Sequence, residues 1–504
     1  MSNHLFDAIR AAAPGDAPFI RASGGRIWTY QDALDLSSRL ASAMDTLGIR
    51  PGDRVAVQVD KSAEALILYL ACIRSGAVYL PLNTAYTLAE LDYFVGDAEP
   101  RLFVVSSPAR EGVEKIAKAH GAIVETLDTD GTGSLLDLAR DEAADFVDAS
   151  RSADDLAAIL YTSGTTGRSK GAMLTHGNLL SNATTLRDYW RVAAADRLIH
   201  ALPIFHTHGL FVATNVTLLA GASMFLLPKF DPDEVLSLMR HATLLMGVPT
   251  FYVRLLQSPR LDRQAVANMR LFISGSAPLL AETHTEFKDR TGHAILERYG
   301  MTETNMNTSN PYAGPRIAGT VGFPLPGVTV RVTDPATGAV LPPDETGMIE
   351  VKGPNVFKGY WRMPEKTAAE FTSDGFFISG DLGKIDKDGY VHIVGRSKDL
   401  VISGGYNIYP KEVEGEIDQL DGVAESAVIG VPHPDFGEGV TAIVVRKPDA
   451  ALDEKAILRA LQERLARYKQ PKRIIFAEDL PRNTMGKVQK NVLRQKYADL
   501  YART

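Results

Sequence analysis

Short apolar runs alternate with helical segments from residue 27 to about residue 300. WTYQDALDLSSRLASAMDTLG and SAEALILYLACIRSG have apolar residues at helical spacing, whereas RVAVQV and RLFVVS are short runs typical of strands. LIHALP, ASMFLLP, TLLMGVP and MRLFISG continue the series. Apolar strands separated by helices are typical of parallel sheets covered by helices. The alternation therefore predicts an α/β fold with helix-covered sheets.

The pattern changes after about residue 310. TVRVTD, GMIEVKG, GFFISGDLGKID and GYVHIVG are short and separated by Gly, Asp or Pro turns, which predicts an antiparallel, β-barrel-like subdomain within about 310–395. A last α+β unit follows, with helices over YPKEVEGEIDQL, DEKAILRALQERLARY and VQKNVLRQKYADLY and strands over AVIGVP, AIVVRK and RIIFAE. We expect an N-terminal domain of residues 1–395 and a small, mobile C-terminal domain of residues 396–504.

Composition excludes several classes of function. The 504-residue chain has a net charge of -7, which argues against the basic field of a nucleic-acid binder. Cys72 is the single cysteine, so no intrachain disulfide can form, and its apolar neighbours favour packing over nucleophilic chemistry. The N-terminus lacks a signal-peptide core, and the apolar runs are shorter than the ~20 residues of a membrane span. We expect a cytoplasmic protein with small-molecule substrates and no nucleic-acid, membrane or obligate protein partner.

The segment YTSGTTGRSKG at residues 161–171 follows the apolar run LAAIL. Its hydroxyl and backbone N–H groups can surround phosphate oxygens, and Lys170 adds a positive charge. A Walker loop would place Gly, Lys and Ser/Thr in succession, but Lys170 lies between Ser169 and Gly171. The segment therefore predicts a phosphate-binding loop of another kind, although its composition also suits a polar surface loop.

This loop resembles that of the adenylate-forming superfamily, which includes acyl-CoA synthetases, peptide-synthetase adenylation domains and firefly luciferase. Further family motifs follow in order over nearly the whole chain: SGSAPL at 274–279, ERYGMTET at 297–304, SGDLG at 379–383, GRSKDLVISGGYNIYP at 395–410 and PRNTMGKVQK at 481–490. The resemblance implies an enzyme that uses ATP to convert a carboxylic acid into its acyl-AMP and then transfers the acyl group to coenzyme A.

The resemblance also implies a nucleotide site. Tyr299 is expected to face adenine, Asp381 to accept hydrogen bonds from the ribose, and Arg396 to lie at the ribose or phosphate. Glu303 and Thr165 are expected to hold Mg²⁺, a hard cation that prefers oxygen ligands. Without the resemblance, Tyr299 could be a core aromatic, Asp381 a turn residue and Arg396 a surface cation. The expected ATP/AMP-binding residues are Thr162, Ser163, Gly164, Thr165, Thr166, Gly167, Lys170, Ser276, Ala277, Tyr299, Gly300, Met301, Thr302, Asp381, Arg396 and Lys487.

Lys487 follows Asn-Thr-Met-Gly, before a predicted helix. A lysine near a C-terminus is usually solvated, but the matching family lysine bridges the substrate carboxylate and the α-phosphate. Attack of a carboxylate on ATP builds negative charge at phosphorus, which a fixed cation offsets. The resemblance thus implies Lys487, Glu303 and Thr302 as catalytic residues, and no general base is needed because the nucleophile is already ionised.

The second half-reaction uses another arrangement in the family. The C-terminal domain rotates about a hinge residue that corresponds to Lys398, which withdraws Lys487 from the site. The rotation brings the SGGYN loop to the pantetheine tunnel. The resemblance therefore implies that Ser403, Gly404 and Gly405 bind coenzyme A.

Arg298 directly precedes Tyr299, where resembling monoacid ligases often have a small residue. Because side chains alternate along a strand, Arg298 is expected to point away from adenine and into the acyl pocket. A buried guanidinium there can grip a second carboxylate of the substrate; a structural ion pair with Glu297 is the alternative. Ser274 and His206 are expected beside that carboxylate. Malonate is the first expectation, followed by methylmalonate and other short diacids.

Three alternatives remain open. His206 and His208 are spaced by one residue and could suggest a metal site, but no third ligand is evident, so we favour the pocket wall. A peptide-synthetase adenylation module is another possibility, but no carrier segment follows Lys487. A non-catalytic AMP- or acyl-binding regulator would be expected to lack Lys487 or Glu303, and this chain keeps both.

Overall fold

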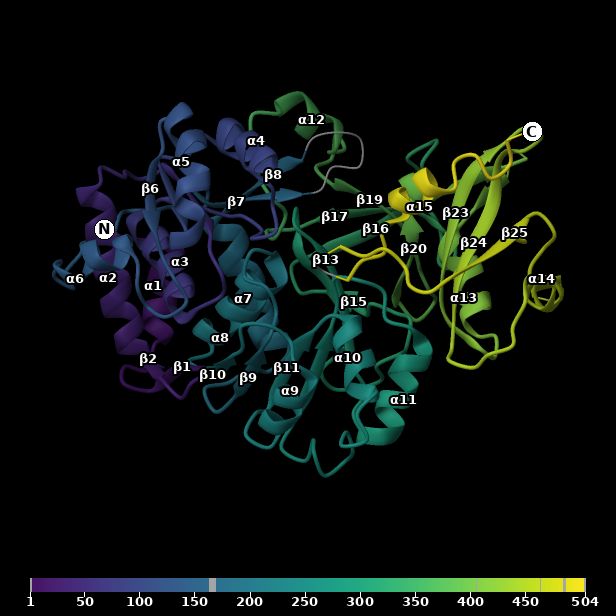
Figure 1. The fold of residues 1–504 in the computed structure, drawn as a ribbon, viewed down its shortest axis with the longest axis horizontal. Coiled ribbons are helices and arrows are strands. Elements are labelled where there is room, and N and C mark those ends of the chain that lie inside the picture. Colours follow the sequence, from purple (N-terminus) through teal and green to yellow (C-terminus); the bar gives the residue numbers. More distant parts are fainter. Residues whose placement is uncertain (1, 163–168, 405, 463, 484–485, 503–504) are drawn as a thin grey trace.

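One of the two large sheets of the molecule has seven strands. The computed structural model describes residues 2–162, 169–404, 406–462, 464–483 and 486–502 (Figure 1). The strand order is β18-β8-β7-β4-β3-β5-β6. Neighbours from β7 to β6 pair in parallel, as the alternation predicted, whereas β8 and β18 run antiparallel to their neighbours. The strands are β3 (Arg54–Gln58), β4 (Val78–Pro81), β5 (Leu102–Val105), β6 (Ile123–Thr126), β7 (Leu156–Thr162), β8 (Lys170–Thr175) and β18 (Gly359–Tyr360).

The other large sheet has nine strands and carries Ser274 and Arg298. Its order is β15-β14-β13-β12-β11-β9-β10-β1-β2. The strands from β1 to β13 in that order pair in parallel, so their carboxyl ends lie at one edge. The strands are β1 (Pro18–Ala22), β2 (Ile27–Thr29), β9 (Arg197–His200), β10 (Ser223–Leu226), β11 (Leu244–Gly247), β12 (Leu271–Ser274), β13 (Leu296–Met301), β14 (Asn305–Ser309) and β15 (Phe323–Pro324).

Helices join the two sheets into one large core. α7 contacts β7 and β8 of the first sheet and β14 of the second, and it packs on α1 and α8. α3 begins after the N-cap Ser62 and ends at Gly76, whose positive φ of 72° suits glycine. The helices are α1 (His4–Ala12), α2 (Tyr30–Thr46), α3 (Ala63–Ser75), α4 (Leu88–Ala98), α5 (Arg110–Ala119), α6 (Ser134–Arg140), α7 (His176–Tyr189), α8 (Asn215–Leu219), α9 (Pro232–Met239), α10 (Pro249–Leu256), α11 (Ala281–Thr291) and α12 (Pro364–Ala369). Within the described ranges, no helix combines the length and apolarity needed to cross a bilayer.

The predicted antiparallel region is a four-stranded sheet with β16 and β20 at its edges. All three of its strand pairs are antiparallel, which confirms the change of pattern after residue 310. The strands are β16 (Thr329–Thr333), β17 (Gly347–Lys352), β19 (Phe377–Ile385) and β20 (Val391–Arg396).

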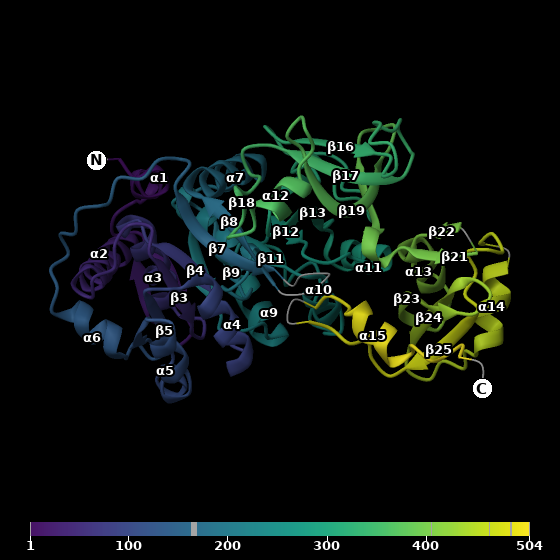
Figure 2. The same cartoon turned by 90° about the horizontal axis from the view of Figure 1, so that it is seen from above.

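The C-terminal unit lies beside the larger part of the molecule (Figure 2). Its sheet has the order β22-β21-β24-β23, with β25 paired to β24, and it has separate apolar clusters of its own. The elements are β21 (Val401–Ser403), β22 (Tyr406–Ile408), β23 (Val423–His433), β24 (Gly437–Arg446), β25 (Arg473–Ala477), α13 (Pro410–Asp418), α14 (Glu454–Gln462) and α15 (Lys490–Lys496).

The last predicted helix was too long. α15 ends at Lys496, and the chain continues to Tyr501 in turns. Tyr501 instead packs its ring against His433 and its hydroxyl lies 2.9 Å from Thr441 Oγ1. These tertiary contacts with β23 and β24 replace the last helical turn, which a local pattern does not show.

Candidate active site

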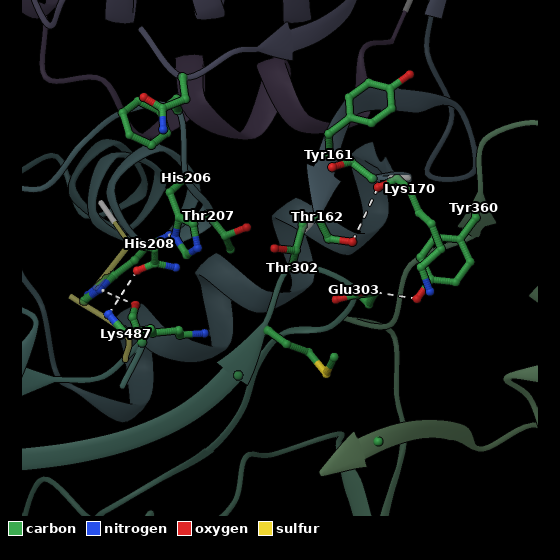
Figure 3. Close-up of a pocket in the computed structure, with 18 of the residues that line it drawn as sticks. Tyr161, Thr162, Lys170, His206, Thr207, His208, Thr302, Glu303, Tyr360 and Lys487 are labelled. Atoms are coloured by element: carbon green, nitrogen blue, oxygen red, sulfur yellow. Dashed lines mark hydrogen bonds between the residues drawn. The ribbon is translucent and has the colours of Figure 1, made fainter. Parts of the chain in front are cut away.

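A cavity of about 1230 Å³ lies at the carboxyl ends of the parallel strands of the larger sheet. Its walls come from β7, the loop before α8, β13, β19 and the loop that precedes α15 (Figure 3). This edge is the usual ligand site of open α/β sheets, because several loops converge there. The last of these loops belongs to the C-terminal unit, so both parts of the chain line one cavity.

One side of the cavity, here called the nucleotide end, contains Lys170, Tyr360, Glu370 and Glu303. Lys170 Nζ lies 3.1 Å from Glu370, and the Tyr360 hydroxyl lies 2.7 Å from Glu370 and 3.0 Å from Glu303. Figure 3 shows Tyr360 beside both Lys170 and Glu303. Burial raises the pKa of Glu303. The charged groups at this end thus bind one another through a shared phenol.

A second charged cluster, formed by Tyr299, Asp381 and Arg396, adjoins the cavity, and its Arg396 lines the wall. The Tyr299 hydroxyl donates to Asp381 Oδ2 at 2.5 Å, and Arg396 Nε lies 2.7 Å from Asp381 Oδ1. Asp381 and Tyr299 are held by β19 and β13, whereas Arg396 ends β20. Burial raises the pKa of Tyr299, and the neighbouring Asp381 adds to that shift. The phenol therefore stays protonated and keeps its hydrogen bond at neutral pH.

Lys487 enters the cavity from the C-terminal unit. Its backbone N–H donates to Asn483 Oδ1 at 2.9 Å, and its carbonyl accepts from the Asn483 N–H at the same distance. Gly486 has a φ of 74°, and a Cβ there would lie 3.3 Å from Thr250 of α10. Burial and, as a smaller cause, the nearby Arg396 charge lower the pKa of Lys487 to about 8. The loop thus presents a lysine whose ammonium is poorly solvated.

Arg298 forms the centre of the opposite side of the cavity. The residue is 3% exposed, and neither its Nε nor its Nη2 has a hydrogen-bond partner among the described residues. Burial lowers its pKa to about 9, which leaves the guanidinium charged at neutral pH. Within the described chain no ion pair joins it to Glu297, which lies 3.2 Å from His284 instead. A buried cation without a partner is costly, so this geometry favours an anionic ligand.

Glycine at position 275 makes room for that guanidinium. A Cβ on Gly275 would lie 2.4 Å from Arg298 Cζ and 2.6 Å from its Nε. Carbon atoms do not approach that closely without displacement of one group. Gly275, from the end of β12, therefore permits the observed position of Arg298, a role that the sequence did not reveal.

Other buried polar atoms lack partners in this part of the molecule: Thr207 and His208 line the cavity with Arg298, and Ser274 pairs in the sheet with Glu297, the neighbour of Arg298. We call Arg298, Ser274, Thr207 and His208 the acid pocket. Ser274 Oγ, Thr207 Oγ1 and His208 Nε2 are buried and lack hydrogen-bond partners in the described structure. The other ring nitrogen of His208 lies 3.3 Å from Ser276 Oγ. Burial and the Arg298 charge lower the pKa of His208, so its ring is neutral. Sequence reasoning missed Thr207, whose only signal was its place between two histidines.

His206 lines the cavity together with His208 and Lys487. Burial lowers its pKa to about 3, and Lys487 contributes more to the shift than Arg298 does. For His208 the larger electrostatic contribution comes from Arg298. His208 begins the π-helix η2 (His208–Thr214), a rare element that is frequent at functional sites. Arg298 therefore acts on both histidines, and Lys487 acts on His206 as well.

Family models match both parts of the chain. The model for the AMP-binding enzyme matches residues 7–361, and the model for the AMP-binding enzyme C-terminal domain matches residues 412–487. The chain belongs to the AMP-binding enzyme family.

Relatives within this family cover nearly the whole chain. The crystal structure of ATP-bound MatB from Rhodopseudomonas palustris is 63% identical, with a TM-score of 0.98 over 99% of this chain and 100% of that one. A feruloyl-CoA synthase of Amycolatopsis is 39% identical over 94% of this chain and 95% of its own length. A malonate–CoA ligase of Arabidopsis thaliana is 36% identical over 89% of this chain and 78% of its own. This enzyme is thus an AMP-forming acyl-CoA ligase with the two-part fold of its family.

The structure sorts the predicted site residues into groups. The cavity is lined by Thr162, Lys170, His206, Ser276, Arg298, Gly300, Met301, Thr302, Glu303, Arg396, Lys398 and Lys487. Ser274, Ala277, Tyr299 and Asp381 lie outside that lining set in the described structure. Ser403 and Gly404 lie at the end of β21 in the C-terminal unit. Ser163, Gly164, Thr165, Thr166, Gly167 and Gly405 lie outside the described residues.

Proposed function

We propose that the acid ligated to coenzyme A by this enzyme is malonate, with a malonyl-AMP intermediate and release of AMP and pyrophosphate. The observation that carries the proposal is the buried guanidinium of Arg298, whose Nε and Nη2 have no hydrogen-bond partner in the described part of the chain. A guanidinium can hold a carboxylate through two parallel hydrogen bonds. The acid pocket adds one ring nitrogen, His208 Nε2, and two hydroxyls, Ser274 Oγ and Thr207 Oγ1. None of these atoms has a hydrogen-bond partner among the described residues. The malonate–CoA ligase of Arabidopsis thaliana supports the same acid.

In the first half-reaction, the free carboxylate of malonate attacks the α-phosphorus of ATP. A carbon–oxygen–phosphorus linkage forms, and the bond from the α-phosphorus to the pyrophosphate oxygen breaks. We propose that Lys487 offsets the negative charge that develops, since its amine is poorly solvated beside the cavity. The distal carboxylate binds Arg298, which holds the nucleophile in place and lowers the entropy cost of the attack. Malonate is already ionised, so no proton is removed.

Mg²⁺ belongs to this proposal as the ion that accompanies ATP. Glu303 fits it, because its carboxylate is 6% exposed and lines the cavity between Thr302 and the Tyr360 hydroxyl. Mg²⁺ is usually held by one or two carboxylates together with phosphate oxygens rather than by an all-protein cage. Consistent with that preference, the described residues contain no group of three or more His, Cys, Asp or Glu placed to hold a metal. When bound, the ion supplies positive charge to the phosphates.

In the second half-reaction, the thiol of coenzyme A attacks the malonyl carbonyl, and AMP leaves. We propose that the C-terminal domain of residues 396–504 turns about Lys398 between the two steps, which brings Ser403 and Gly404 to coenzyme A. The exposed Lys398 lies in the short helix η3 (Ser397–Asp399), which follows β20 and precedes β21. Replacement Lys398→Pro fixes φ near −65° and should let the acyl-AMP accumulate while CoA transfer fails. Equal loss of both steps in a folded variant would contradict the hinge.

The feruloyl-CoA synthase relative shows why identity over the whole chain does not choose the acid. It matches this enzyme at a higher identity than the malonate–CoA ligase does. Ferulate has an aromatic body without a second carboxylate. Its ring would leave Arg298 buried without a counterion, at a cost of several kcal/mol. The acid pocket, not the overall similarity, therefore favours malonate.

The test is CoA-dependent release of AMP from ATP with a panel of acids. Malonate should give the highest kcat/KM, followed by methylmalonate and other short diacids, with acetate, propionate and ferulate far below. A preference for any monoacid would overturn malonate and leave the acyl-CoA ligase assignment intact.

A further inference from the structure

A lysine and a histidine lie directly behind the loop that carries Thr207 and His208. Lys61 precedes α3, and His200 ends β9, yet Lys61 Nζ lies 2.9 Å from His200 Nδ1. Lys61 Nζ also donates to the carbonyl oxygens of His200 at 2.7 Å and Leu202 at 2.8 Å. We propose that Lys61 and His200 are positioning residues that hold residues 202–209 so that Thr207 and His208 face the substrate's distal carboxylate.

The donor and acceptor roles follow from the geometry. His200 Nε2 lies 2.9 Å from the Gly209 carbonyl, which can only accept, so Nε2 carries the proton. Nδ1 is then a lone pair that faces Lys61. An ammonium has three N–H donors, and three acceptors surround Lys61: Nδ1 and the two carbonyls. Every hydrogen of the lysine amine is used, and both imidazole nitrogens have their partner.

The network holds both ends of the loop. Lys61 binds the carbonyl of Leu202 at the start, and His200 binds the carbonyl of Gly209 at the end. Thr214 Oγ1 also donates to the Gly209 carbonyl, at 3.0 Å. A Cβ on Gly209 would lie 2.1 Å from the Pro203 carbonyl oxygen, so the two ends of the loop are packed against each other. Thr207 and His208 project from a segment whose endpoints have little freedom.

The charge of Lys61 has no role as a structural ion pair. It forms none with an acidic side chain in the described part of the chain, and His200 is fully buried and neutral, since burial and the Lys61 charge both lower its pKa. Burial also lowers the pKa of Lys61. A buried ammonium bound only by neutral groups costs free energy, which suggests a function beyond stability. The contacts of Lys61 with His200 and Leu202 are suited to holding Thr207 and His208 in place in the acid pocket.

The test is a comparison of the KM values for malonate and ATP, so it rests on the proposed function. Lys61→Met removes the amine and keeps the length of the side chain. It should raise the KM for malonate about tenfold, the effect of losing roughly one well-placed hydrogen bond, and leave the KM for ATP unchanged. His200→Phe should act in the same way. The double variant should be no worse than either single one, because both remove one connected network.

Exposed Lys229, just beyond β10 at the same edge of the sheet, gives the matched control Lys229→Met, which should behave as wild type. If Lys61→Met does not fold, the same KM comparison is made with His200→Gln, whose amide can still donate to the Gly209 carbonyl. A rise in the KM for malonate without a rise in the KM for ATP supports the inference. Equal rises in both KM values, or no rise in a folded variant, overturn it. If wild type rejects malonate, the proposed function fails instead, and the two failures are distinct.

Discussion

The two sides of the cavity treat their charges in opposite ways. At the nucleotide end, Lys170 and Glu303 are joined through Tyr360 and Glu370. In the acid pocket, Arg298 Nε and Nη2, Ser274 Oγ, Thr207 Oγ1 and His208 Nε2 have no hydrogen-bond partner among the described residues. Groups that bind one another must exchange partners when ATP arrives, whereas unpartnered groups gain hydrogen bonds outright when an anion arrives. The difference predicts that the acid pocket can accept an anion without breaking contacts of its own, whereas ATP binding must rearrange contacts at the nucleotide end.

The strongest test of this difference is Arg298→Ala. Removing one partner of a buried ion pair costs about 3–5 kcal/mol, so kcat/KM for malonate should fall by roughly 10²–10³ or more. Acetate and propionate have no distal charge, so any activity with them should fall far less or rise. Steady-state assays with all three acids measure this. The exposed Arg254 provides the control Arg254→Ala. An equal fall for malonate and propionate would break the dicarboxylate assignment.

Lys487→Ala tests the cation that lies between the two sides. Loss of a transition-state charge partner should lower acyl-AMP formation by ~10²–10³, measured as ATP–pyrophosphate exchange. Thioester formation from supplied acyl-AMP should persist, because that step does not build charge on the α-phosphorus. Lys496→Ala, on the exposed end of α15, is the control. Normal exchange in Lys487→Ala would rule out its catalytic role.

The pH dependence of the adenylation step gives a second test of whether the Lys487 ammonium is required. The lowered pKa of Lys487, about 8, means that its ammonium is lost as pH rises through that value. The kcat/KM for pyrophosphate exchange should therefore fall above pH 8, toward tenfold per pH unit. Lys487→Arg keeps its charge to higher pH, so its residual activity should not fall above pH 8 in this way. A fall at the same pH in both enzymes would assign it to another group.

Tyr360→Phe should have the smallest effect. It removes the hydroxyl that joins Glu303 to Glu370 but leaves Lys170 bound to Glu370. Loss of a hydrogen bond of this kind costs about 1 kcal/mol, so the KM for ATP should change by roughly fivefold or less, while the KM for malonate stays constant. Tyr252→Phe, whose hydroxyl donates to the Ile273 carbonyl, is a control for the loss of a buried hydroxyl. A larger effect on malonate than on ATP would show that the two sides are coupled.

The fold class, the change to antiparallel strands and the reaction could all be predicted from the sequence. Strand and helix patterns are local, and the family motifs occur as continuous segments, so both can be read without coordinates. The charge of Arg298 follows from its residue type, and alternation along one strand predicts that its side chain points away from that of Tyr299. The length of α15 could not be predicted, because contacts of Tyr501 with distant strands end it.

The pairing of the charges could not be predicted without the three-dimensional arrangement of the elements. Whether Arg298 binds Glu297 or stands alone depends on His284 and on the space above Gly275, which come from other elements. The contact between Lys61 and His200 spans 139 residues and has no local signal. Hydrogen bonds and burial depend on distance in space, and a sequence pattern records distance along the chain. The preference for a dianionic acid therefore becomes a physical argument only once the fold brings these side chains together.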